Sequence, residues 1–114
     1  MTRDEAVRLI GGELAAAEKS PGNPGRVRVC ARRAAGHAIA FRETQPDGRY
    51  YGGSALARLQ GAAADDALPA GVRNAAGRLV AHIDPAPTSP RGADLLEDAA
   101  VVIEYFLRGE ARGK

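Results

Sequence analysis

The chain has 114 residues, of which 24 are alanine, 14 glycine and 7 proline, with no tryptophan and five aromatic side chains. Only 23 larger apolar side chains (Val, Leu, Ile, Met and Phe) remain for a core, so we expect one small domain over residues 1–114. Sixteen basic and 14 acidic residues leave a net charge of +2, which does not by itself indicate nucleic-acid binding. A single cysteine, Cys30, and two histidines exclude an internal disulfide and a thiolate metal cage, and we expect no metal site and no cofactor.

Two long helices are predicted in the first part of the chain. Thr2 and Glu5 have the spacing of a capping box, and the apolar residues that follow predict a helix from about residue 3 to 19. Asn23 followed by Pro24 predicts the start of a second helix that reaches about Glu43. Steps of three and four residues mark its buried side, which consists of Val27, Ala31, Ala34, Ala38 and Phe41. The alternation over residues 26–30 is also compatible with a strand, but no partner strand with that period lies nearby.

Three further helices are predicted in the second part. Ser54, after two glycines, predicts a capped helix to about Ala64, and Pro69 opens the next one. This fourth helix has apolar residues at helical spacing as far as Ile83, and Asp84 followed by Pro85 is expected to end it. The last helix is expected from Asp94 to about Gly109. It has two apolar faces, one made of Leu95, Ala99, Val102 and Phe106 and the other of Leu96, Ile103 and Leu107.

These elements predict an all-α protein, an antiparallel bundle of four or five helices with short connections. We expect the second helix at the centre of the bundle, because its alanines allow neighbouring helices to approach closely, and we expect Cys30 on its buried side. The last helix needs neighbours on both of its apolar faces. Together with the thin core, this feature predicts a homodimer.

The longest uninterrupted apolar run, residues 99–103, is far shorter than a membrane span, and the N-terminus begins with polar residues, which indicates a cytoplasmic protein. The charges are unevenly distributed. Residues 21–43 carry five arginines and one glutamate, whereas residues 93–114 carry three basic and five acidic groups. Pairing of the basic second helix with the acidic last helix, in the same or a second copy, explains this as simply as a nucleic-acid surface does.

The order of these elements, over roughly residues 3–109, resembles the HEPN domain family, small helical modules named for their occurrence in higher eukaryotes and prokaryotes and for nucleotide binding. The resemblance lies in the Ala-rich first helix, the stretch VCARRAAGH at 29–37, the Leu–Pro break before the fourth helix, and LLEDAA at 95–100 followed by YFL at 105–107. It implies a four- to five-helix bundle that commonly dimerises. It also implies a partner, because some members pair with a minimal nucleotidyltransferase, whereas others are metal-independent ribonucleases.

The ribonuclease branch of that family is marked by an Arg and a His with four to six residues between them, usually near the start of a late helix. Arg32 and His37 have this spacing but lie in the second helix, about 140° apart around its axis, so they do not converge on one phosphate within a single copy. Arg33 and His37 share a face but are only four residues apart, as are Arg78 and His82. The catalytic candidates are therefore Arg32, Arg33 and His37, with the imidazole as general acid or base and a guanidinium stabilising the phosphorane charge. The alternative is a solvated helix face.

The loop before the third helix contains a second set of candidates. Two adjacent aromatic rings, an arginine and a glycine pair before a helix N-terminus have the chemistry to stack a base and hold its phosphate. The nucleotide-binding candidates are Arg49, Tyr50, Tyr51 and Ser54. The alternative is that these residues only form a turn and a hydrophobic lid.

The sequence thus leads to three hypotheses. The first is a non-enzymatic, homodimeric HEPN-like interaction module that binds a protein such as a nucleotidyltransferase. The second is a metal-independent ribonuclease in which Arg32, Arg33 and His37 meet across a dimer interface. The third is a helical scaffold with an unrelated role.

Overall fold

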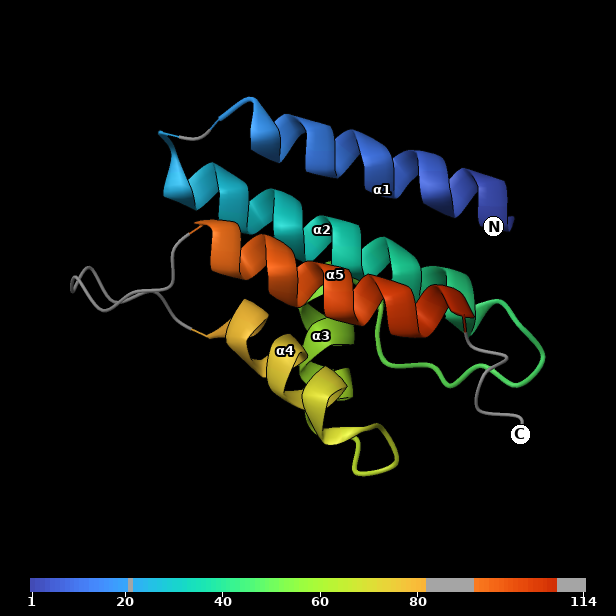
Figure 1. Cartoon of the computed structure of the whole chain (residues 1–114). Helices are drawn as coiled ribbons and strands as arrows, with labels where there is room; N and C mark the ends of the chain where they lie inside the picture. The colour runs from blue at the N-terminus through green and yellow to red at the C-terminus, as the bar shows by residue number, and fades with distance from the viewer. Residues whose placement is uncertain (21, 82–91, 109–114) are drawn as a thin grey trace.

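A computed structural model of the chain describes residues 1–20, 22–81 and 92–108 (Figure 1). Its helices are α1 (Arg3–Glu18), α2 (Pro24–Glu43), α3 (Ala55–Ala63), α4 (Ala70–Val80) and α5 (Gly92–Arg108). No strand occurs in the described part of the chain, so the predicted all-α bundle is confirmed. None of the described helices is long and apolar enough to cross a membrane.

The second helix lies at the centre of the bundle, as predicted. α2 packs against each of the four other helices. The side that faces them is made of small residues with no exposed surface: Ala31, Ala34, Ala35 and Ala38. Because alanine projects only one carbon from the backbone, several helices can approach the same short length of α2. Cys30 is buried on this helix with 4% of its surface exposed, also as predicted.

The contacts at the helix N-termini confirm the predicted starts of α1, α2 and α3. The Thr2 hydroxyl accepts a hydrogen bond from the Glu5 amide at 3.1 Å, and the Glu5 carboxylate accepts one from the Thr2 amide at 2.7 Å. The side chains of Asn23 and Ser54 each accept from an amide three residues further on, at 3.0 and 3.1 Å. These bonds satisfy amides that have no partner inside the helix. Residues 26–30 lie within α2, so the strand alternative for them is wrong.

The helices differ in direction (Figure 1). α1 and α2 run antiparallel, whereas α2 and α5 run parallel, because the chain returns to its starting end through α3 and α4. Contacts at both ends show this arrangement. Leu96, near the start of α5, packs against the cluster that contains Val27 and Cys30, near the start of α2. At the other end, Arg42 of α2 donates to the carbonyl of Phe106 of α5. The loop after α2 therefore lies beside the end of α5.

The fourth helix ends earlier than predicted. α4 stops at Val80, and Ala81 is extended, with φ −58° and ψ 141°. Arg32 of α2 donates its Nε to the carbonyl of Leu79 at 2.5 Å and its Nη2 to the carbonyl of Ala81 at 3.3 Å. In a helix continued to residue 83, the Leu79 carbonyl would accept from the amide of that residue instead. A side chain from another helix thus replaces the next helical hydrogen bond. Ile83, the Asp84–Pro85 stop and the prolines at 87 and 90 lie outside the described residues, as does Gly109.

The last helix has neighbours on both of its apolar faces within the same chain. Leu95, Ala99, Val102 and Phe106 are buried, and Leu96, Ile103 and Leu107 are partly buried against the same core. The neighbours are α2 and α4. The predicted need for two partners is therefore met by one copy of the chain, and the two-faced α5 no longer requires a dimer.

The arginines of α2 form no ion pair with the acids of α5 in the parts of the chain that the structure describes. Arg42 of α2 binds a main-chain carbonyl of α5. Asp98 of α5 pairs instead with Arg78 of α4, and Glu104 pairs with Arg108 of its own helix. Pairing within one copy does not explain the uneven charge along the sequence.

Alanine is predicted to have opposite effects on stability at Gly36, where α2 crosses α3, and at Gly12 on α1. A Cβ at Gly36 would lie 2.8 Å from the Cβ and 3.0 Å from the Cα of Ala55, whereas one at Gly12 on exposed α1 meets nothing within 4 Å. We expect Gly36→Ala to lower the free energy of unfolding by about 1–3 kcal/mol through overpacking. Gly12→Ala should raise it by up to about 1 kcal/mol through helix propensity. Urea unfolding measures both, and two stabilising effects would show that α2 and α3 do not approach this closely.

Candidate functional site

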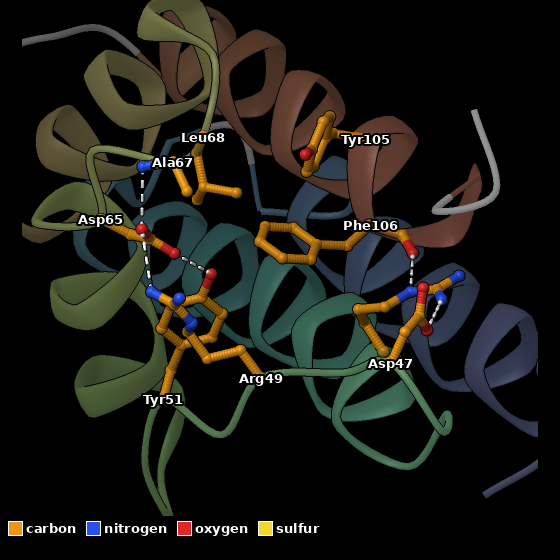
Figure 2. Close-up of a pocket in the computed structure, with 9 residues that line it drawn as sticks. Asp47, Arg49, Tyr51, Asp65, Ala67, Leu68, Tyr105 and Phe106 are labelled. Atoms are coloured by element: carbon orange, nitrogen blue, oxygen red, sulfur yellow. Dashed lines mark hydrogen bonds and ion pairs between the residues drawn. The ribbon is translucent and has the colours of Figure 1, made fainter. Parts of the chain in front are cut away.

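A pocket of about 280 Å³ lies where three segments meet: the loop after α2, the turn between α3 and α4, and the end of α5 (Figure 2). Its lining consists of Arg42, Asp47, Arg49 and Tyr51 from α2 and its loop, Asp65, Ala67 and Leu68 from the turn, and Tyr105 and Phe106 from α5. The Arg49 and Asp47 side chains are 63% and 49% exposed, whereas Leu68 and Phe106 are buried. The pocket therefore has a charged rim and an apolar floor, and its size is at the lower end of small-molecule sites, about 300 Å³.

Glu43, the last residue of α2, fixes the path of the loop. Its carboxylate accepts hydrogen bonds from the Tyr51 amide at 2.8 Å and from Arg58 Nε of α3 at 3.1 Å. Gly52 then has φ +156°, and a Cβ there would lie 2.6 Å from the Cβ of Ala57. A residue with a side chain would be strained at this position. One carboxylate and one glycine together turn the chain so that Tyr51 faces α5.

The Asp65 carboxylate connects the loop to the turn between α3 and α4 (Figure 2). Its Oδ2 accepts from the Tyr51 hydroxyl at 2.6 Å, and its Oδ1 accepts from the Ala67 amide at 2.9 Å and pairs with Arg49 Nη1 at 3.0 Å. The hydrogen bond from Tyr51 is the main reason why the pKa of Asp65 is lowered. Burial, and then the bond to Asp65, raise the pKa of Tyr51. Near neutral pH the carboxylate is therefore ionised and the phenol protonated.

Aromatic rings form the floor of the pocket. The Phe106 ring meets Tyr51 edge-to-face at 6.1 Å and Tyr105 edge-to-face at 5.2 Å between centroids. Arg42 donates its Nε to the Phe106 carbonyl at 3.3 Å and pairs through Nη1 with Asp47 Oδ1 at 3.1 Å. In Figure 2 the Phe106 ring lies between the group of Arg49, Tyr51 and Asp65 and the Asp47 end of the pocket. One guanidinium group is thus present at each end of an aromatic floor.

Two of the four predicted nucleotide-binding candidates line this pocket. Arg49 and Tyr51 do so, but Tyr50 is 73% exposed and is not part of the lining. The Ser54 hydroxyl accepts from the Ala57 amide as the N-cap of α3. The loop thus combines turn geometry at Gly52 and Ser54 with pocket residues at Arg49 and Tyr51.

The predicted catalytic candidates lie elsewhere, on α2. Arg32 binds the carbonyls at the end of α4, whereas His37 Nε2 lies 3.7 Å from Glu13 Oε2 of α1. Within one copy Arg32 and His37 therefore point toward different neighbours of α2, in agreement with their predicted angular separation. Arg33 is exposed one turn before His37.

Arg78 and His82 form the other Arg–His pair that is four residues apart, and the structure describes only Arg78. Arg78 donates through Nε and Nη2 to both oxygens of Asp98, at 2.9–3.1 Å, and so joins α4 to α5. The bonds to Asp98 raise the pKa of Arg78. Arg78 is therefore held in a bidentate structural pair, and His82 lies outside the described residues.

Sequence reasoning missed most of the pocket. Arg42, Asp47 and Asp65 carry no local motif, and Phe106 was assigned only to the core seam of the last helix. They belong to segments as far as 64 positions apart in the sequence. Only the loop residues had a local signal, in the combination of aromatic residues, arginine and glycine.

The described residues contain no group of three or more His, Cys, Asp or Glu side chains that could hold a metal ion. No protein-family model, curated protein or solved structure matches this chain. The resemblance to the HEPN family therefore stays a prediction, and the function must be argued from the residues of the chain itself.

Phenylalanine substitutions at the two adjacent tyrosines of the loop are predicted to differ in their effect on stability. Tyr51→Phe removes the hydrogen bond to Asp65, and we expect it to lower the free energy of unfolding by about 1 kcal/mol. Tyr50→Phe alters an exposed side chain, and its effect should stay within about 0.5 kcal/mol. Urea unfolding of both variants measures the difference. Equal effects would contradict the role of Tyr51 in holding the turn between α3 and α4.

Proposed function

We propose that this chain is a HEPN-like helical binding module rather than an enzyme, and that the pocket between the loop after α2 and the end of α5 is its ligand site. The observation that carries the proposal is the pocket itself. It combines a buried aromatic floor at Phe106 with a charged rim at Arg49 and Asp47. An apolar concave site with a few convergent polar groups is the usual form of a small-molecule site.

The protonation states of the pocket favour binding over catalysis. General acid–base catalysis works best when the pKa of the catalytic group is near the operating pH. Here the pKa of Asp65 is lowered and that of Tyr51 is raised, so both groups keep their protonation states around neutral pH. The described lining also contains no serine, cysteine or histidine to act as a nucleophile or base. The polar groups of the pocket are suited to hold a ligand in place.

The proposal includes a protein partner, either a second copy of the chain or a nucleotidyltransferase. The support for it is α1, which packs mainly against α2 and leaves large apolar side chains exposed. Val7 is 50% exposed and Leu9 43% exposed, and Met1, just before the helix, is 43% exposed. Burial of such residues against a partner would stabilise the complex.

The partner proposal predicts self-association. We expect light scattering at micromolar concentration to give a mass of about twice 11.9 kDa, because a dimer buries the apolar residues of α1. Val7→Glu should lower the measured mass, whereas Val101→Glu on α5, at a similarly exposed position, serves as the matched control. A mass near 12 kDa for the unaltered chain would remove the homodimer. Affinity purification at native level with mass spectrometry then tests for a nucleotidyltransferase.

A ribonuclease is the alternative function, and one observation favours it. Arg33 and His37 lie one turn apart on α2, and the His37 imidazole has a carboxylate, Glu13, at 3.7 Å that can orient it. Because Arg32 points toward α4, this alternative needs a second copy to supply another cation to the same phosphate.

A titration followed by ¹H–¹⁵N NMR tests the binding proposal against this alternative. The probes are a small aromatic acid, an aromatic amide, a sugar and an amine. We expect at least one of them to shift amide signals of the pocket, at residues 47–51, 65–68 and 105–106, because these residues surround the bound molecule.

The same preparation is incubated with single-stranded RNA, and no cleavage is expected. Shifts that lie only outside the pocket would contradict the site. If the purified chain cleaves RNA, and His37→Ala abolishes the cleavage while the NMR spectrum shows a retained fold, the binding proposal is wrong and the ribonuclease function is supported.

A further inference from the structure

We infer that the pocket takes a small planar aromatic molecule with one acidic group, a carboxylate or a phosphate, whose ring lies against Phe106 and whose acidic group binds Arg49. This inference rests on the proposed function, since it names the ligand class of the same site.

The floor of the pocket favours a flat ring. Phe106 and Leu68 are buried beneath it, and Tyr51 and Tyr105 stand at steep angles to the Phe106 ring, at 85° and 87°. Aromatic rings prefer offset-stacked or edge-to-face neighbours, so a floor made of aromatic rings favours a planar aromatic ligand. The volume of about 280 Å³ admits a one- or two-ring molecule.

On the Arg49 side of the pocket, hydrogen-bond donors outnumber the acceptors that they can bind. Asp65 is the acceptor there, and its two oxygens already receive the Tyr51 hydroxyl, the Ala67 amide and Arg49 Nη1. Arg49 has five N–H groups, and its ion pair with Asp65 uses the Nη1 end of the guanidinium. A ligand on this side therefore meets unused guanidinium donors and a carboxylate that is already satisfied. An anionic acceptor fits this side best.

Arg49 can reach a ligand without leaving Asp65. The Arg49 side chain is 63% exposed, whereas the Asp65 side chain is 7% exposed, and the ion pair between them uses Nη1 of Arg49. The other N–H groups of the guanidinium can therefore bind an acidic group while Nη1 continues to compensate the buried Asp65 carboxylate. At the opposite end, the Arg42 side chain is only 16% exposed, and its Nε and Nη1 are engaged by the Phe106 carbonyl and by Asp47. Arg49 is therefore the guanidinium that an acidic group reaches more easily.

Three ligands that differ in one property each test the inference by NMR titration. 2-Naphthoate supplies ring and charge, 2-naphthamide keeps the ring without the charge, and decahydronaphthalene-2-carboxylate keeps the charge and the two-ring size without the aromaticity. We expect 2-naphthoate to shift the pocket signals and to bind about tenfold more tightly than the other two, since a charge-assisted bond and ring contacts are both needed. 1-Naphthyl phosphate, in a parallel titration, shows which acidic group binds more tightly.

Two matched variants test whether Arg49 binds the acidic group of the ligand. We expect Arg49→Gln to weaken 2-naphthoate binding about tenfold and to leave 2-naphthamide unchanged. Arg8→Gln removes the same charge from an exposed position on α1, a helix that contributes no residue to the lining of the pocket, and should change neither affinity. The NMR spectrum of each variant without ligand reports whether its fold is intact.

The outcomes separate the inference from the proposed function. Equal binding of naphthoate and naphthamide at the pocket, or equal loss in the Arg49 and Arg8 variants, would overturn the acidic ligand while the pocket kept its role as a binding site. Equal binding of decahydronaphthalene-2-carboxylate would overturn the aromatic requirement. No shift at the pocket with these ligands or with the wider probe set would overturn both.

Discussion

The whole structure depends on the close packing of four helices around α2. Four alanines on this helix have no exposed surface, and Gly36 lies so close to α3 that a Cβ would meet Ala55 at 2.8 Å. A chain with only 23 larger apolar side chains cannot fill wide gaps between helices. Small residues at the centre solve this problem, because they shorten the distances that the larger side chains of the neighbouring helices must fill.

This packing also determines where the pocket forms. Because α2 and α5 lie side by side in parallel, their C-terminal ends are adjacent, and the loop after α2 must cross the end of α5 before α3 begins. Glu43 holds this loop through the Tyr51 amide and Arg58. Asp65 then joins the loop to the turn between α3 and α4. The pocket is the space left between this loop, this turn and the end of α5, and the two carboxylates hold the loop to α3 and to the turn.

The pocket combines a buried aromatic side chain with an exposed arginine, and this combination suits the proposed binding of a ligand. Phe106 is buried within the core, whereas the Arg49 side chain is 63% exposed and pairs with Asp65. A fixed floor keeps its shape before the ligand arrives, which reduces the entropy lost on binding. An adjustable arginine at the rim can close on the acidic group afterwards. The candidate catalytic residues on α2 have no such arrangement, since Arg32 is bound to the end of α4.

The sequence alone determined the helices, because their signals are local. Capping residues such as Thr2 and Asn23, and apolar residues at helical spacing, act within a few positions, and all five predicted helices are present. The early end of α4 was not predictable, since it depends on Arg32 from another helix. Tertiary structure also decided the parallel course of α2 and α5 and the pocket. The loop motif pointed to Arg49 and Tyr51, but Arg42, Asp65 and Phe106 join them only through packing between distant segments, which leaves no periodic signal in the sequence.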